Sequence, residues 1–454
     1  MAMQTAHIIV GGGLGGLFSA KVLIERGYSN IVIVEKSLEI GGLLQHVMIE
    51  NPLGDGNDFY FDQGTHFVLE PDDPYLQKMV RSDIPLEEYT SFNGSLHEAH
   101  ILNGHLYEQS GCPSILSFPL EVQRKIKDEL ETLHQAPEDT QESENFYEEC
   151  IKRYGDTATN LVYKPAYKKF TGMALDALDV SMGNFFAPGR LIVDDRETSI
   201  LLKKDPDWNW RIAFSNCNDS VSDIVKYYPR TSGIGHWLET MALNLQKNGV
   251  RILTDTTIDQ IETEKAHIKN ITLSSGEKLE CEKLIWSLPA IFLAMQTGID
   301  VPSKKPVMRQ VSLVHFLLDQ RPIERPHWVT VYDQNLLSYR ITLYDNFTPS
   351  HHNVFRITVE ILHDDEFNEE GLEDKIFAEL KTLSIVPPET RKLWVGRANK
   401  PQGFPVLSAS HRQIYIKQNQ ILEQTYNNVA IVGRRPDTGG GQLAIMNHIW
   451  NTLK

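Results

Sequence analysis

Two short apolar runs near the start of the chain have the pattern of buried strands. Residues 7–10 and 31–34 are rich in isoleucine and valine, as are strands that a parallel sheet covers on both faces. Residues 17–26 between them are largely apolar over a helical length, and Gly27 is a natural stop for that helix. This part of the sequence therefore predicts a strand–helix–strand unit.

Shorter strands are expected further along. Residues 250–254, 258–261, 267–271 and 283–289 are separated by turns such as Ser275-Gly276, which favours antiparallel pairing. Residues 311–318, 328–333, 337–343 and 353–362 also alternate in polarity, whereas residues 116–134 and 146–154 have helical patterns. The end of the chain predicts a strand from residue 428 followed by a helix that reaches Leu453.

Composition narrows the class of protein. The 454 residues are enough for about two to three domains. The formal charge of −16 argues against nucleic acid as a partner, but an arginine cluster could still bind an anionic substrate. The four cysteines form no CxxC pair, so we expect neither disulfides nor a metal site. No apolar run reaches the roughly 20 residues of a membrane helix, and the start lacks the pattern of a signal peptide, so we expect a cytoplasmic protein.

A glycine-rich turn follows the first strand and predicts a dinucleotide site. In Gly11-Gly-Gly13-Leu-Gly-Gly16, the first glycine permits a tight turn and the second lets the backbone approach a pyrophosphate. Gly16 lets the helix pack closely on the strand, and the helix N-terminus offers free N–H groups to phosphate. Glu35 at the end of the second strand is placed to accept hydrogen bonds from a ribose. Alone, this fingerprint fits NAD and FAD equally.

The continuation Glu35-Lys36, followed by Gly41-Gly42, resembles that of the flavin amine oxidase and protoporphyrinogen oxidase-like superfamily. The resemblance implies FAD as the cofactor. It also implies that the residue matching Ile258 contacts adenine through its backbone, and that the final helix after Gly433-Arg434 points its N-terminus at the flavin. The cofactor-binding residues expected are Gly11, Gly13, Leu14, Gly15, Gly16, Glu35, Lys36, Gly41, Gly42, Leu43, His66, Ile258, Gly433, Arg434, Gly441, Gln442 and Leu443.

The same resemblance predicts an α/β fold with a discontinuous cofactor domain. A Rossmann-like FAD-binding domain of the GR2 type would consist of residues 1–74, 229–299 and 404–454. Residues 75–228 and 300–403 would form an inserted substrate domain of antiparallel sheet and helices. A substrate pocket is then expected between the two domains, because pockets favour domain interfaces.

Three further motifs resemble the UDP-galactopyranose mutase-like, sugar-pathway branch of this superfamily. They are residues 61–66 (FDQGTH), 163–172 (YKPAYKKFTG) and 228–235 (YPRTSGIG). Two departures from that branch weigh against mutase chemistry: Phe170 replaces a substrate-stacking tryptophan, and residues 438–441 replace tyrosines that hold a diphosphate.

Five side chains are candidates for substrate chemistry. His66 would face the flavin, Arg190 and Arg340 could bind an anionic group, and Tyr167 and Tyr339 could hydrogen-bond the substrate. Each has an ordinary packing role as its alternative. The leading interpretation is an FAD-dependent oxidoreductase acting on a nucleotide-sugar or polysaccharide-related small molecule. A mutase that uses reduced FAD and a non-catalytic flavoprotein are the alternatives, and the sequence leaves the oligomeric state open.

Overall fold

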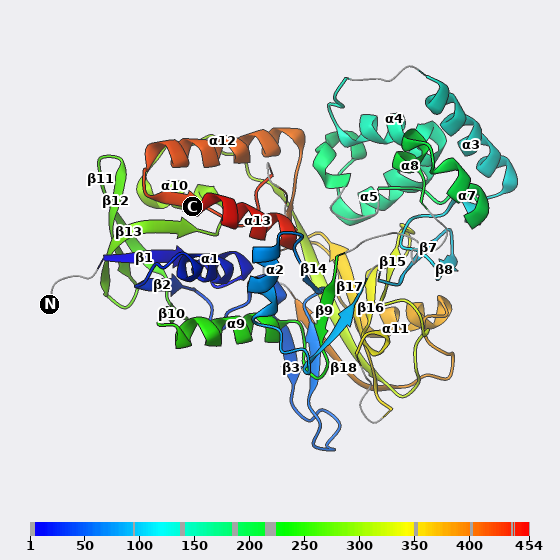
Figure 1. The fold of residues 1–454 in the computed structure, drawn as a ribbon. Helices are drawn as coiled ribbons and strands as arrows, with labels where there is room; N and C mark the ends of the chain where they lie inside the picture. The colour runs from blue at the N-terminus through cyan, green and yellow to red at the C-terminus, as the bar shows by residue number, and fades with distance from the viewer. Residues whose placement is uncertain are drawn as a thin grey trace.

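The computed structural model describes residues 5–93, 96–136, 141–183, 189–213, 224–348, 353–399, 403–436, 439 and 441–453. They form an α/β protein with two large sheets and a separate helical unit (Figure 1). Within these ranges, no helix is long and apolar enough to cross a membrane.

The first sheet has a parallel centre and an antiparallel edge. Its order is β10 (Arg251–Leu253), β2 (Ile31–Val34), β1 (Thr5–Val10), β13 (Lys278–Trp286), β12 (His267–Leu273) and β11 (Ile258–Glu264), and β20 (Val429–Ile431) also pairs with β13. Strands β10, β2, β1, β13 and β20 run parallel, whereas β11 and β12 are antiparallel. The sheet is therefore assembled from three stretches that lie far apart in the sequence.

Helices cover both faces of this sheet. Alternate residues of its strands, such as Ile9 and Ile33, pack with α1 (Leu14–Glu25), α9 (Gly235–Lys247) and α13 (Gln442–Thr452). Their neighbours Ile8 and Val32 point the other way, toward α10 (Ala290–Thr297) and α12 (Ala409–Thr425). Burial on both faces explains why these strands are continuously apolar.

The second sheet has one apolar face and one mixed face. Its order is β18 (Lys392–Asn399), β14 (Val307–Leu318), β17 (Phe355–His363), β16 (Ser338–Leu343), β15 (Trp328–Val331), β7 (Glu98–Leu102) and β8 (His105–Tyr107), and β19 (Phe404–Val406) pairs with β14. The apolar face, which includes Val329, Ile341 and Val359, packs against α11 (Leu372–Thr382). On the opposite side, β16 and β17 carry the polar and charged side chains Arg340, Thr342, Thr358 and Glu360 among apolar neighbours such as Leu317 and Trp328. This polar part of the sheet is called the polar face and forms the site described below.

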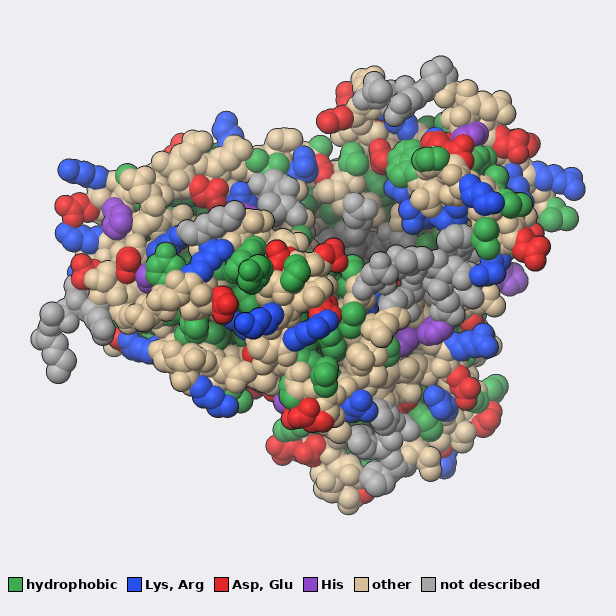
Figure 2. Space-filling view, in the orientation of Figure 1, with side chains coloured by type: hydrophobic (Ala, Val, Ile, Leu, Met, Phe, Trp, Pro, Cys, Tyr) green, Lys and Arg blue, Asp and Glu red, His purple; other side chains and the backbone are tan. Residues whose placement is uncertain are grey.

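The remaining elements connect these layers. The helical unit consists of η2 (Ile115–Ser117), α3 (Leu120–Gln135), α4 (Phe146–Ala158), the π-turn η3 (Thr159–Tyr163), α5 (Lys164–Thr171), η4 (Leu175–Ala177), η5 (Val180–Met182), α7 (Arg196–Leu202) and α8 (Pro206–Arg211). The small elements are η1 (Gly42–Leu44), β3 (His46–Ile49), β4 (Phe59–Asp62), β5 (Val68–Leu69), α2 (Pro74–Arg81), β6 (Tyr89–Phe92), β9 (Lys226–Pro229) and η7 (Tyr344–Asn346). The surface is hollowed between the helical unit and the layer that carries α1 and α13 (Figure 2).

The predicted fold class is confirmed, with local differences in element boundaries. Helix α1 begins at Leu14, three residues earlier than predicted, because the glycines after Gly13 already adopt helical geometry. The helix expected from residue 116 begins instead at Leu120, after Pro119, because proline has no N–H for a helical hydrogen bond. Strand β19 joins the second sheet through β14, although residues 404–406 were assigned to the cofactor domain. The domain boundaries themselves stay a prediction.

Candidate active site

The glycine-rich turn lies at the carboxyl edge of the first sheet. The Gly11 amide donates to Val34 O at 2.9 Å, which joins the ends of β1 and β2. A Cβ on Gly16 would lie 1.8 Å from Gly11 O, so only glycine allows α1 to approach the turn this closely. By contrast, a Cβ on Gly13 would meet no heavy atom of a described residue closer than 3.8 Å. Gly13 thus leaves space beside the N-terminus of α1 that no described residue fills.

The second pair of glycines closes this space from one side. Gly13 forms an isolated parallel bridge with Gly41, and the Gly41 amide donates to Gly12 O at 2.9 Å. A Cβ on Gly42 would lie 3.4 Å from the Cα of Gly13. The segment that carries Lys36 and Leu43 therefore passes directly over the turn, with both of these side chains exposed.

Glu35 binds the backbone of the turn. One carboxylate oxygen accepts from the Gly12 amide at 2.6 Å, and the other accepts from the Ser37 amide at 2.8 Å. An ionised carboxylate has capacity for about four hydrogen bonds, so Glu35 retains acceptors for a ribose hydroxyl. The carboxylate therefore orders the turn and could bind a nucleotide at the same time.

The C-terminal segment meets the turn at Gly433. This residue has φ +97°, and a Cβ there would lie 2.7 Å from Ser287 O, so glycine is needed for both conformation and packing. A Cβ on Gly15 would lie 3.5 Å from the Cα of Gly433. The adjacent Arg434 is exposed to solvent, yet the surrounding protein lowers the pKa of its guanidinium by desolvation.

The start of α13 is tied to the segment that carries His66. Gln442 donates from Nε2 to Phe67 O at 2.9 Å, and its Oε1 accepts from the Leu69 amide at 3.3 Å. Gly441 caps the helix, and Leu443 packs against the adjacent hydrophobic core. The start of α13 is thus fixed beside the segment that carries His66.

His66, Arg340 and Glu360 surround Gly64. A Cβ on Gly64 would lie 3.3 to 3.4 Å from the side chains of all three residues. Arg340 and Glu360 form a bidentate pair, with Nε–Oε1 at 2.5 Å and Nη2–Oε2 at 2.9 Å. Burial alone would lower the pKa of Arg340, but the field of Glu360 leaves it raised, so the guanidinium is charged. Two of the separately predicted candidates, His66 and Arg340, therefore lie close together, beside the carboxylate of Glu360.

These side chains belong to the polar face of the second sheet. Arg340 pairs with Glu360 across β16 and β17, and the next positions in the same direction are Thr342 and Thr358. The Thr342 hydroxyl is 2.5 Å from the hydroxyl of Thr65, which lies beside His66. The polar face of the second sheet thus packs against residues 61–66, which include the end of β4.

The other candidates are placed differently. Tyr339 is almost fully buried, stacks edge-on with Phe170 at 5.0 Å, and lies next to the Arg340 guanidinium. Tyr167 is buried in the helical unit, where its hydroxyl donates to Gly183 O at 3.1 Å. Arg190 is exposed, and its charge acts on Lys203 of the helical unit; no contact among the described residues joins it to Arg340. Roles for these residues toward a substrate stay predictions.

The adenine contact expected of Ile258 also stays a prediction. Ile258 begins β11, where its carbonyl accepts from Gln296 Nε2 of α10 at 3.3 Å. Its side chain packs against the core on the α10 and α12 side of the first sheet.

Sequence reasoning missed two carboxylates of the polar face, Glu98 and Glu360. Glu360 is 4% exposed in β17, between the buried apolar residues Val359 and Ile361. Glu98 opens β7, which continues with buried Ala99, Ile101 and Leu102. A charge at the inward position of a buried strand is the signal that could have identified both.

The family comparison agrees with this geometry. The family described as flavin containing amine oxidoreductase matches residues 14–392, and the chain belongs to that family. Its members are flavoenzymes, so a flavin cofactor is implied for this chain.

Solved structures share the fold at low sequence identity. Reduced UDP-galactopyranose mutase superimposes with a TM-score of 0.77 at 17% identity, covering 98% of this chain and 94% of that one. A putative protoporphyrinogen oxidase from Exiguobacterium sp. 255-15 gives 0.69 at 15% identity, covering 99% and 98%. Cyclohexylamine oxidase from Brevibacterium oxydans IH-35A gives 0.58 at 11% identity, covering 98% and 96%. At these identities the likeness extends to the fold alone.

Proposed function

We propose that the protein is an FAD-dependent oxidoreductase that acts on a polar small molecule, of which a nucleotide-sugar or a polysaccharide-related compound is the leading candidate. The observation that carries the proposal is the convergence of four separate segments. The glycine turn, the Gly41-Gly42 segment, Gly433-Arg434 and the start of α13 meet at one edge of the first sheet. The polar face with His66 and Arg340 lies next to them.

The residues present fit a dinucleotide of this kind. The space beside Gly13 and the free amides at the start of α1 suit a pyrophosphate. Glu35 suits the adenosine ribose, and the start of α13 suits the electron-accepting edge of an isoalloxazine ring, where a helix dipole stabilises negative charge. Bound FAD supplies a two-electron acceptor.

The chain's own side chains would bind and orient the substrate. Arg340 is held rigidly by Glu360, so its remaining guanidinium N–H groups are pre-oriented toward a ligand. His66 lies within reach of the same space and can accept or donate a hydrogen bond there. The aromatic wall of Tyr339 and Phe170 excludes water on the side of the helical unit.

An anaerobic titration tests this function. Purified protein is loaded with FAD, checked for the flavin absorbance, and mixed with amines, sugars and nucleotide-sugars in turn. Bleaching of the flavin by one of these compounds, with formation of its oxidised product, is the expected result. A protein that stays colourless after incubation with FAD would contradict the proposal and support a non-catalytic scaffold instead.

A mutase that uses reduced FAD is the second candidate, favoured by the superposition on reduced UDP-galactopyranose mutase over nearly the whole chain. The two reactions differ in redox balance. Nucleotide-sugars are therefore incubated with and without dithionite, and the products are separated by chromatography. Ring isomers that form only with dithionite, without net oxidation, would replace the oxidoreductase by the mutase.

A further inference from the structure

The turn between β15 and β16 is bound by a lysine of the helical unit. Lys169, in the last turn of α5, donates from Nζ to Val331 O at 3.0 Å, at the end of β15. The same Nζ donates to Asp333 O at 2.9 Å and to Ser338 O at 2.7 Å, and Ser338 begins β16. An ammonium group has three N–H donors, so all of them are used. One side chain therefore joins the two ends of the turn.

The amides of this turn are bound by a carboxylate from α11. Glu379 accepts from the Leu337 amide at 2.8 Å and from the Ser338 amide at 2.9 Å, and the Ser338 hydroxyl also donates to it. The charge of Glu379 acts on Lys169 as well. The turn is thus held between a cation that binds its carbonyls and an anion that binds its amides.

Lys169 is itself fixed to the second sheet through its main chain. Arg309 of β14 donates from Nη2 to Lys169 O at 2.8 Å and to Leu362 O of β17 at 3.0 Å. The next residue, Phe170, packs edge-on against Tyr339 with ring centroids 5.0 Å apart. Because its main chain is anchored in this way, Lys169 holds the turn at a defined position relative to both the sheet and the helical unit.

Strand pairing alone leaves the position of Tyr339 open. Across β16 and β17, Ser338 pairs with Ile361, and the next pair is Arg340 with Glu360. Tyr339 between them is an extra residue at a bulge. The pairing of β15 with β16 ends at Arg340 and does not extend to Tyr339. The contacts to Ser338, directly before the bulge, therefore determine where the Tyr339 ring lies.

We propose that Lys169 is a positioning residue for the substrate site, which fixes Tyr339 and Arg340 by holding the turn directly before them. The inference rests on the proposed function, in which Arg340 orients the substrate and Tyr339 excludes water together with Phe170. Small displacements matter at such a site, because a reacting group misplaced by about 1 Å can lose about 100-fold in rate. In this role Lys169 acts through Tyr339 and Arg340 and need not touch the substrate.

Hydrogen exchange of the FAD-loaded protein tests the inference without a known substrate. Burial lowers the pKa of Lys169 to about 7, so exchange is measured at pH 6, where the ammonium form supplies all three donors. Lys169→Met keeps an unbranched side chain and removes the donors. We expect the amides of residues 332–340 to exchange at least about tenfold faster in this variant, because local opening no longer breaks three hydrogen bonds. Exchange in α1 and α9 should stay as in wild type.

Lys169→Arg is the conservative variant. The guanidinium keeps the positive charge and several N–H donors, so it should restore most of the protection of residues 332–340. A space-filling role would be served by methionine as well as by arginine, so this rescue distinguishes hydrogen bonding from packing.

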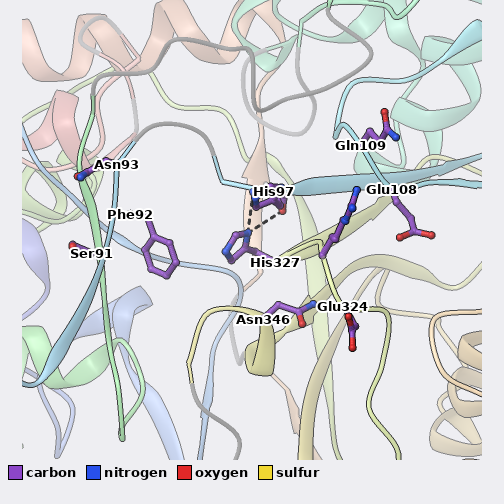
Figure 3. A pocket seen from close by; sticks show the side chains of 10 residues that line it. Ser91, Phe92, Asn93, His97, Glu108, Gln109, Glu324, His327 and Asn346 are labelled. Carbon is purple, nitrogen blue, oxygen red and sulfur yellow. Dashed lines mark hydrogen bonds between the residues drawn. The ribbon is translucent and has the colours of Figure 1, made fainter. Parts of the chain in front are cut away.

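Two matched controls separate the effect from a general loss of hydrogen bonds. Lys168→Met removes the neighbouring lysine, whose Nζ donates at 2.7 Å to a carbonyl within the helical unit. Asn346→Ala removes two hydrogen bonds to main-chain carbonyls, those of Ile323 and Pro326. Asn346 follows the other end of β16 and lines a groove of about 770 Å³ there (Figure 3). Both variants should leave exchange of residues 332–340 as it is in wild type.

A substrate found in the anaerobic titration gives the second measurement. Its concentration at half-saturation should rise at least about tenfold in Lys169→Met, and Tyr339→Ala should raise it as well. The double variant should lose much less than the product of the two effects, because Lys169 acts through Tyr339.

Wild-type exchange of residues 332–340 in Lys169→Met, or no rescue by arginine, would overturn the inference. An unchanged half-saturation concentration in a Lys169→Met protein whose turn does open would overturn the positioning role. Failure of the proposed function is recognised separately, because no compound then bleaches the flavin of wild type. The positioning role falls with it, while exchange still reports that Lys169 holds the turn.

Discussion

Asp62 accepts a hydrogen bond from the Tyr228 hydroxyl at 2.7 Å, across 166 positions of sequence. The second carboxylate oxygen accepts from the Ile234 amide at 2.9 Å, and the Asp62 amide donates to the Tyr344 hydroxyl at 2.9 Å. Asp62 thus joins the segment that carries His66 to the loop that enters α9 and to the second sheet. Two motifs that are separate in the sequence are one structural unit.

This carboxylate predicts a dependence of stability on pH. Burial raises the pKa of folded Asp62 to about 7, whereas the unfolded value is near 3.8. The folded state therefore binds more protons between these values, and the contribution of Asp62 to stability falls as pH rises from about 4 through 7, by at most about 4 kcal/mol. Asp62→Asn keeps the shape and both partners, so the free energy of unfolding should depend less on pH in this variant.

Chemical denaturation at pH 5 and pH 8 measures the effect, and Asp62→Ala is the comparison. The alanine variant leaves Tyr228 and the Ile234 amide without an acceptor, so we expect it to be less stable than wild type at both pH values, by about 1–3 kcal/mol. Equal pH dependence in wild type and Asp62→Asn would show that Asp62 does not carry the effect.

Two glycines of the turn should respond in opposite ways. Gly16→Ala places a Cβ 1.8 Å from Gly11 O, so α1 must move, and we expect a loss of about 3 kcal/mol or more. Gly13→Ala meets no atom closer than 3.8 Å, so it should fold with stability within about 1 kcal/mol of wild type. Its Cβ occupies the space proposed for the pyrophosphate, so its affinity for FAD should fall at least tenfold.

Thermal unfolding without cofactor and flavin-fluorescence titration measure the two effects separately. A Gly13→Ala protein that folds and binds FAD like wild type would refute the assignment of the phosphate site.

Arg340 and Glu360 should be strongly coupled. Arg340→Met leaves the buried Glu360 carboxylate unpaired, so we expect a loss of about 3–5 kcal/mol. Glu360→Met leaves the partly exposed Arg340 unpaired, so we expect a smaller loss. The double variant should lose much less than the sum, because neither charge is left. A double-mutant cycle by denaturation gives the coupling energy, and additive losses would contradict the pairing. Arg340→Lys keeps the charge but loses the bidentate geometry, so it should retain more stability than Arg340→Met.

The first sheet was predictable because its signals are local. The run from Ile31 to Val34 is apolar throughout, and Gly16 is required within a few residues of Gly11, so pattern and spacing are enough. The nearness of His66 to Arg340 was not predicted, since nothing local relates positions that are so far apart in the sequence.

The polar face was not predicted because it depends on strand register. Glu98, Arg340 and Glu360 share a face only after β7, β15, β16 and β17 have paired in the observed register. A shift of one residue would turn any of these side chains toward α11. The contact of Tyr167 was not predictable from sequence for a related reason: only the packing of the helical unit brings its hydroxyl to Gly183 O.

Gln442 connects the final helix to the segment that carries His66 by two hydrogen bonds. Its Nε2 donates to Phe67 O, and its Oε1 accepts from the Leu69 amide. Gln442→Ala removes both and leaves the Phe67 carbonyl without this donor. We expect a loss of about 1–3 kcal/mol in stability and weaker FAD binding, since the start of α13 and His66 would no longer be held together. Gln413→Ala, at an exposed position of α12, is the matched control and should change neither property.

The flavin absorbance spectrum gives a readout that general destabilisation would not change. In folded, FAD-saturated Gln442→Ala at low temperature, the visible bands should shift relative to both wild type and the control. Identical spectra and dissociation constants in all three proteins would show that the start of α13 does not contact the flavin and that Gln442 has a packing role only.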